Sequence, residues 1–229
     1  GVYNRKITTK MKRKTASFTG MRPIFTGSPS IVQGGFNLDV DGQKFRVGDV
    51  IPAGTLAIFN ETTRKVQVIK TAKVVEVNSE NTKKLTLYVD EFFAPCFAVG
   101  ESVLKAGAVT GTFASAPTIT AIDNGNSLNN TGNVYVVTLS AAISGLKAGD
   151  VLVEVVKDGS SNAAERGKAN SVLFKEYEVG EFETGVDVSA DTMQYALYER
   201  RVPPIPTSQK DSTGMFLSAN PHVKLTQSY

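Results

Sequence analysis

Short segments of alternating apolar and polar residues, separated by Gly, Asn and Asp, run through the middle of this 229-residue chain. Alternation with a period of two places every second side chain on the same face of a strand, as in a half-buried β-sheet. Segment 151–156 is nearly all apolar and predicts a central strand. Strands are expected at 56–59, 65–70, 74–77, 85–89, 118–122, 134–139, 151–156 and 172–179. The pattern predicts a mainly β protein.

The sharpest local signal is the pair Asp41-Gly42, which stands between the alternating segments 36–40 and 43–47. An Asp-Gly pair favours a two-residue β-hairpin turn, because that turn needs positive φ angles. We therefore expect segments 36–40 and 43–47 to pair as a hairpin.

One short helix is expected near the C-terminal end. It would begin at Ser189 or Asp191, which are both acceptable N-cap residues, and run to about Arg201. Prolines at positions 203, 204 and 206 would stop it, because proline lacks an amide hydrogen and clashes with the preceding turn. Residues 203–229 are then expected to form an extended, proline-rich tail.

The positive charge of the chain is concentrated at its N-terminal end. The first 22 residues hold seven cations and no anion, whereas the whole chain has a net charge of +3. Such a block is typical of a solvated segment or of an arm that becomes ordered on an acidic surface. Thr and apolar residues are interleaved with the cations, which favours a protein surface over nucleic acid. The candidate contact residues are Arg5, Lys6, Lys10, Lys12, Arg13, Lys14 and Arg22.

Few residues offer catalytic chemistry. His222 is the one histidine, and it lies in the expected tail beside a proline. Cys96 is the one cysteine, so no disulfide can form within the chain, and its apolar surroundings predict a buried thiol. The chain has no zinc motif, no phosphate-binding glycine loop and no dinucleotide fingerprint. Catalysis by a serine or cysteine nucleophile that a histidine activates is therefore not expected.

Carboxylates remain the other enzymatic alternative. Asp39 with Asp41, Asp49, or Glu181 with Glu183 could flank a glycosidic bond. The first pair borders a turn, however, and the second alternates with a phenylalanine as on a solvated strand face. Segment 123–126 has the oxygen-rich look of a calcium loop but holds one carboxylate, so a plain turn is expected. We expect no enzymatic activity, no cofactor and no metal.

No stretch of the sequence approaches the ~20 apolar residues of a transmembrane helix. No apolar region follows the N-terminal charges, as it would in a secretory signal peptide. The sequence therefore predicts no membrane contact, and synthesis and assembly in a cytoplasm.

Three segments share a corner pattern in which Gly and an acid precede an apolar pair. They are 45–54, 97–107 and 146–152, and the second has one residue more than the first. Each corner predicts a tight turn from which the chain re-enters the core. Such corners are typical of the rims of small β-barrels and barrel-like sandwiches.

Together these features resemble the head-decoration (auxiliary capsid) and head-fibre proteins of tailed bacteriophages. The resemblance is carried by the corner segments 48–54, 99–107 and 146–152 and spans roughly residues 33–156. It implies a β-barrel or barrel-like sandwich that stands on a terminal arm laid along the shell. It also implies a homo-oligomer, such as a trimer, bound to the major capsid protein on the exterior of the virion. Whether the chain decorates the shell or anchors a fibre stays open, because it is longer than the smallest members.

The expected organisation has five parts. They are a basic N-terminal arm (1–32), a β body (33–107), a projecting hairpin excursion (108–140), a continuation of the body with the short helix (141–202) and the extended tail (203–229). Two alternatives remain open. One is a carbohydrate- or host-surface-binding module that uses the loop of the excursion, and the other is a nucleic-acid-binding accessory protein that uses the arm.

Overall fold

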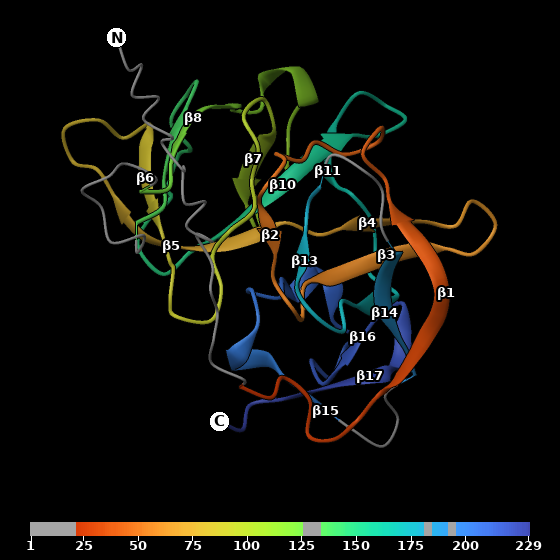
Figure 1. Ribbon diagram of the computed structural model, residues 1–229. Helices are drawn as coiled ribbons and strands as arrows, with labels where there is room; N and C mark the ends of the chain where they lie inside the picture. The colour runs from red at the N-terminus through yellow and green to blue at the C-terminus, as the bar shows by residue number, and fades with distance from the viewer. Residues whose placement is uncertain (1–21, 126–133, 181–184, 192–195) are drawn as a thin grey trace, which may run out of the picture.

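The computed structural model describes residues 22–125, 134–180, 185–191 and 196–229 (Figure 1). Strands account for 40% of the chain, and no described helix reaches seven residues. The expectation of a mainly β protein is therefore confirmed.

The strands are short, as expected from frequent turn residues. They are β1 (Ser30–Leu38), β2 (Val50–Ile51), β3 (Leu56–Asn60), β4 (Lys65–Val68), β5 (Thr71–Val77), β6 (Lys84–Leu87), β7 (Ser102–Lys105), β8 (Ile119–Asp123), β9 (Val136–Leu139), β10 (Val151–Lys157), β11 (Ala163–Glu165), β12 (Ser171–Val172), β13 (Tyr177–Glu178), β14 (Gly185–Asp191), β15 (Ala196–Tyr198), β16 (Phe216–Leu217) and β17 (Asn220–Thr226). Three single 3-10 turns lie at Phe113–Ser115, Glu199–Arg201 and Thr207–Gln209.

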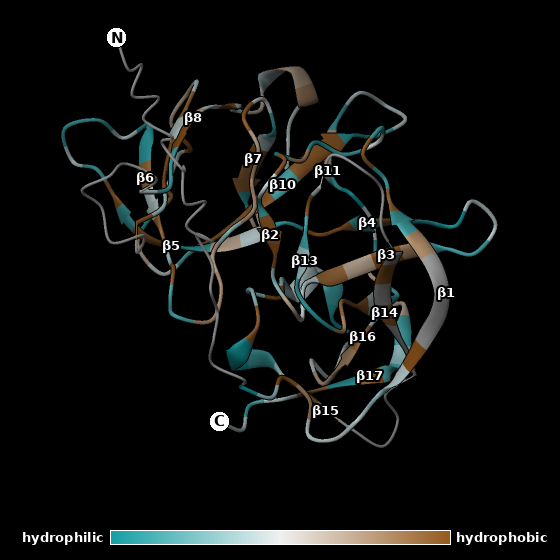
Figure 2. Cartoon of the chain, viewed as in Figure 1, coloured by the Kyte–Doolittle hydropathy of each residue, from teal (hydrophilic) through white to brown (hydrophobic). Residues whose placement is uncertain are grey.

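The strands form two large and two small sheets. The five-stranded sheet has the order β12-β3-β4-β1-β14, and the seven-stranded sheet has the order β11-β10-β5-β6-β9-β8, with β7 also paired to β10. The small sheets are β13-β2 and β15-β17-β16. Strand β10 pairs with β5, β7 and β11, so the predicted central strand is confirmed. Figure 2 shows that this strand carries mostly apolar residues.

Three apolar clusters fill the space between the sheets. The first packs against the five-stranded sheet, and the second is formed by side chains of the seven-stranded sheet. The third lies between β10 and the sheet β15-β17-β16. Fully buried members of the three are, in that order, Phe36 and Val66, Leu85 and Val137, and Leu197 and Val223. Strands such as β4 and β6 bury alternate residues, as the period-two pattern predicts, whereas β10 buries four consecutive residues, as its apolar run predicts.

A sandwich-like β class fits the described strands, which form no closed barrel. Strands β7 and β8, at two ends of the seven-stranded sheet, meet at an isolated bridge between Ser102 and Thr118. The predicted excursion 108–140 supplies β8 and β9, and these two strands pair with each other as expected. Strand β9 also pairs with β6, so the described strands of the excursion belong to the body's own sheet.

The hairpin expected at Asp41-Gly42 is wrong. Segment 43–47 forms no strand, and β1 pairs with β14 and β4 instead. The side-chain amide of Gln43 takes the place of a strand backbone: its Nε2 donates to the carbonyl of Val68 at 2.8 Å, and its Oε1 accepts from the Val68 amide at 3.0 Å. The turn is closed by the Asp39 carboxylate, which accepts from the Gly42 amide at 3.0 Å.

The expected C-terminal helix is also wrong. Residues 185–191 form β14 and residues 196–198 form β15, and only a 3-10 turn follows at Glu199–Arg201. Strand β15 pairs in parallel with β17, which comes from the expected tail. Residues 203–229 are therefore part of the folded body rather than a separate tail: β17 is the middle strand of its sheet, and its Val223 and Leu225 are buried. Pairing with a distant strand outweighed the local helical pattern.

Candidate functional site

The expected N-terminal arm (1–32) is described from Arg22 onward, and Arg22 contacts the body. The Arg22 guanidinium carbon lies 3.8 Å from the centroid of the Phe92 ring, and Nη2 donates to the carbonyl of Arg201 at 3.2 Å. Arg201 Nη1 donates in return to the carbonyl of Pro23 at 2.7 Å. The other six predicted contact residues, Arg5, Lys6, Lys10, Lys12, Arg13 and Lys14, lie outside the described residues.

Backbone hydrogen bonds hold the next residues against β15. The Tyr198 amide donates to the carbonyl of Ile24 at 2.7 Å, and the Thr26 amide donates to the carbonyl of Ala196 at 2.9 Å. Between them the side chain of Phe25 is buried. The expected arm 1–32 therefore has a fixed root from residue 22 onward, and β1 begins within it at Ser30.

A groove of about 490 Å³ lies beside this root. Four phenylalanines and the two arginines contribute to its lining: Phe25, Phe92, Phe93, Phe174, Arg22 and Arg201. The rings of Phe25 and Phe174 are stacked, with their centroids 6.4 Å apart. The groove is assembled from segments far apart in the chain, and sequence reasoning missed it because no local pattern marks it.

The three predicted corners share one turn. Gly48, Gly100 and Gly149 each have a φ of +92°, a value that side chains rarely adopt. In each corner the amide after the glycine donates to the carbonyl three residues earlier, at 3.0, 3.2 and 3.1 Å respectively. The residues that follow re-enter the core, so the expected corners are confirmed.

The acids of the corners have different partners. The Asp49 carboxylate accepts from the Arg46 guanidinium at 2.8 and 3.0 Å. The Asp150 carboxylate accepts from the backbone amide of Lys147 at 2.9 Å, and this bond lowers its pKa. Glu101 instead accepts from the backbone amide of Ala98 and points into a buried polar cluster.

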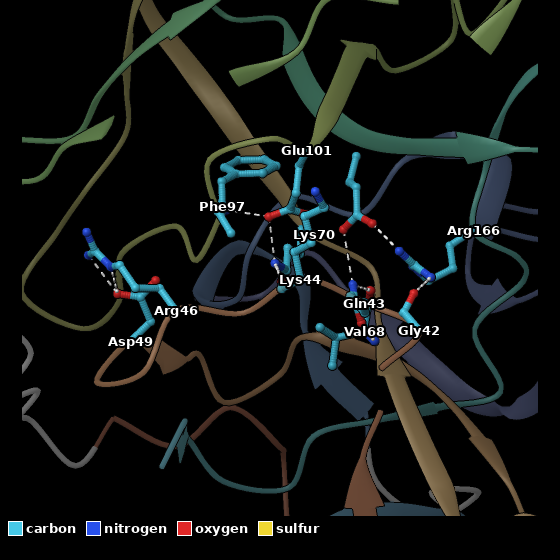
Figure 3. Close-up of polar contacts among 12 residues, drawn as sticks. Gly42, Gln43, Lys44, Arg46, Asp49, Val68, Lys70, Phe97, Glu101 and Arg166 are labelled. Atoms are coloured by element: carbon cyan, nitrogen blue, oxygen red, sulfur yellow. Dashed lines mark hydrogen bonds and ion pairs between the residues drawn. The ribbon is translucent and has the colours of Figure 1, made fainter. Parts of the chain in front are cut away.

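The buried polar cluster (Figure 3) consists of Gln43, Lys70, Glu101, Glu154 and Arg166. Lys70 links β4 to β5, and its side chain has 0% exposure. Its Nζ lies 2.7 Å from Glu101 Oε1 and also donates to the carbonyl of Lys44. A buried ammonium is tolerated here because oxygens of Glu101 and Lys44 accept its hydrogen bonds, and because the nearby Glu154 supplies negative charge.

The second carboxylate of the cluster, Glu154, projects from β10. It accepts from Gln43 Nε2 at 3.0 Å and forms an ion pair with Arg166. Glu101 Oε2 is buried and accepts no hydrogen bond from a described donor. The negative charge of the neighbouring Glu154 favours a proton on Glu101, because two buried carboxylates repel each other.

Burial and the negative charge of Glu154 raise the pKa of Glu101 to about 8. The proton therefore stays on Glu101 at neutral pH, while Glu154 keeps its charge and the pKa of Glu154 is lowered. The buried polar cluster joins the loop after β1 to β7, β10 and β11, so we interpret it as a structural link between the sheets. One member of the cluster carried a local signal in the sequence, namely Glu101, the acid of the second corner.

The remaining candidates have the following surroundings where the structure describes them. Cys96 is buried, which confirms the expected role, and burial raises the pKa of its thiol to about 12. Asp39 and Asp41 both lie 3.6 Å from the ammonium of Lys65. Asp123 accepts from the Gly125 amide at 3.0 Å, as in a plain turn. Glu181 and Glu183 lie outside the described residues.

The described ranges contain no group of three or more His, Cys, Asp or Glu residues arranged to hold a metal ion. Within the same ranges, no helix has the length and apolar character needed to cross a membrane. Comparisons of the chain with protein-family models, with curated proteins and with solved structures found no match.

Proposed function

We propose that this chain is a non-enzymatic structural protein of a phage virion that binds and stabilises the outside of the capsid. The proposal is carried by the corner segments on which the resemblance to head-decoration and head-fibre proteins rests. All three corners have the same glycine turn, and each leads directly into a strand of the β body. The motifs behind the resemblance are thus parts of the β framework.

The position of the arm supports the same proposal. Residues 1–21 hold six cations, and the chain joins the body at Arg22, where side-chain and backbone bonds fix it. A basic segment on a rigid β body can follow an acidic protein surface over a long distance. Ordering such a segment costs entropy, so each arm binds weakly by itself. Several copies around one junction of the shell would add their contacts through avidity.

Stabilisation follows from selective binding. A protein that binds the expanded shell but not its unexpanded form shifts the equilibrium towards the expanded shell by mass action. The partner in this proposal is the major capsid protein, and no cofactor is needed.

The test compares two variants with equal loss of charge. The first replaces the six cations of residues 1–21 with Gln. The matched control replaces six exposed lysines of the body with Gln: Lys73, Lys83, Lys84, Lys147, Lys157 and Lys224. Occupancy is measured by electron cryo-microscopy on expanded heads assembled from the major capsid protein of the same phage. We expect the arm variant to lose at least tenfold in occupancy, which corresponds to about 1.4 kcal/mol, and the control to stay near wild type.

Failure of the wild-type chain to bind expanded heads would contradict the proposal. Equal occupancy of the two variants would contradict the role of the arm. Selective binding of the body on a glycan array, without head binding, would favour the carbohydrate-binding alternative. Retention on DNA that falls steeply with salt would favour the nucleic-acid alternative.

A further inference from the structure

The groove beside the arm root has a chemistry of its own. Its volume of about 490 Å³ lies within the range of roughly 300–1,000 Å³ that is common for ligand sites. Phe25 and Phe93 are buried, whereas Phe92 and Phe174 are half-buried. Such a lining provides apolar surface for a large side chain.

Two arginines of the lining carry uncompensated charge. Within the described part of the chain, Arg22 and Arg201 contact carbonyl oxygens and aromatic rings, and neither meets a carboxylate. The Nε atom of Arg22 is buried and donates to no described acceptor. A buried donor without an acceptor is costly, so a ligand that brings an acceptor gains free energy.

Two occupants of the groove can be compared by charge: the basic arm of the same chain and an acidic segment of a partner protein. The arm of the same chain brings six cations in residues 1–21, which Arg22 and Arg201 would repel. The rim residues Lys175 and Glu176 carry opposite charges, so the lining as a whole is positive. A carboxylate is the natural partner because it can accept two parallel hydrogen bonds from one guanidinium.

We propose that this groove binds an extended acidic segment of a partner protein, with an aromatic or large aliphatic side chain among the phenylalanines and a neighbouring carboxylate on Arg22 and Arg201. The inference rests on the proposed function and deepens it, because it states the chemistry of the partner surface. Arg22, the last of the seven N-terminal cations, lines the groove, so groove and arm would bind the same acidic surface in continuity.

The test selects binders from a random 12-residue peptide library displayed on mRNA, with the full chain as bait. We expect the enriched peptides to share Asp or Glu beside an aromatic or large aliphatic residue. Affinity of the enriched peptide is then measured by fluorescence anisotropy. Replacing both groove arginines, Arg22→Gln with Arg201→Gln, should weaken binding by about tenfold or more, as expected for lost charge-assisted hydrogen bonds.

The matched control removes the same charge outside the groove, by Arg200→Gln with Lys224→Gln. Arg200 neighbours Arg201 in sequence but contacts Gln227 and the Tyr229 ring. The control should keep wild-type affinity, and Arg201→Gln alone serves if the double variant unfolds. An enriched set without acids, the absence of any enriched set, or equal affinity of both variants would overturn the inference. Head binding by the wild-type chain would still support the proposed function in that case, so the two can fail separately.

Discussion

The corners at Gly48 and Gly100 adopt the same turn, with a φ of +92° in both glycines, but place their acids in different surroundings. Asp49 binds Arg46, whose side chain is 44% exposed. Glu101 binds Lys70, and the side chains of this pair are 3% and 0% exposed. Turn geometry is therefore a local property of the motif, whereas the charge environment of its acid depends on what the rest of the fold brings to it.

The two corners should differ most in the unfolding free energy that is lost when the acid of each is replaced by alanine. Glu101→Ala leaves the buried Lys70 ammonium without the side-chain oxygen that accepts its hydrogen bond at 2.7 Å, which should lower the free energy of unfolding by about 3 kcal/mol. Asp49→Ala breaks a pair that is open to solvent on the arginine side, and the loss should stay below about 1 kcal/mol. Urea unfolding of both variants measures the difference. Equal losses would show that the two corners are energetically alike.

The second expected difference between the corners is how strongly the acid of each makes the free energy of unfolding depend on pH. The pKa of Glu101 in the unfolded chain is near the ordinary glutamate value of 4.5, but folded Glu101 keeps its proton up to a pKa of about 8. Between these values the folded state binds more protons, so the free energy of unfolding falls as pH rises, by at most about 1.4 kcal/mol per pH unit. Above pH 8 this contribution is lost.

The Glu101→Gln variant cannot titrate, so its unfolding free energy should change less between pH 5 and 8. Burial also raises the pKa of Asp49, against the hydrogen bonds and charge of Arg46. That shift is smaller, and Asp49→Asn should retain the wild-type slope in this window. Urea titrations at fixed pH intervals give the slopes. A wild-type curve that is flat from pH 5 to 8 would contradict the assignment of the proton to Glu101.

The second glycine of each corner offers the finest comparison. Gly54 and Gly107 have φ values of +83° and +84°, so alanine should meet similar backbone strain of about 1–2 kcal/mol at both. A Cβ at Gly54 would lie 2.2 Å from Val202 Cγ1, whereas a Cβ at Gly107 would meet nothing within 4 Å. Gly54→Ala should therefore cost about 1–3 kcal/mol more than Gly107→Ala. Thermal unfolding of the two variants tests this, and identical midpoints would rule out the close packing on Val202.

Features that depend on a few neighbouring residues could be predicted from the sequence, whereas features that depend on contacts between distant residues could not. Strands such as β3, β4 and β10 were located because burial on one or both faces leaves a pattern within a few residues. The hairpin failed because Asp41-Gly42 has a strong local preference but Gln43 bonds to Val68, 25 residues away. Two side-chain hydrogen bonds there replaced the ladder that the dipeptide favours.

The helix failed for a similar reason. The segment before Arg201 has helical spacing and an N-cap residue, but β15 pairs with Lys224–Thr226 near the other end of the C-terminal region. Three prolines correctly indicated a break after Val202 but could not show that the chain would turn back and form β17. Lys70 gave no signal either, because a lysine in an apolar run looks like a solvated residue until its partners are known.

The sequence by itself determined the mainly β class, most strand positions and the glycine corners, because alternation and positive φ are properties of a few neighbouring residues. Only the tertiary structure decided which strands pair, why Lys70 is buried, and how a groove forms beside Arg22. Those features join groups separated by many residues, such as Lys70 and Glu101, which lie 31 positions apart. Their contacts depend on the path of the whole chain, since the free energy of a buried charge is set by everything that surrounds it.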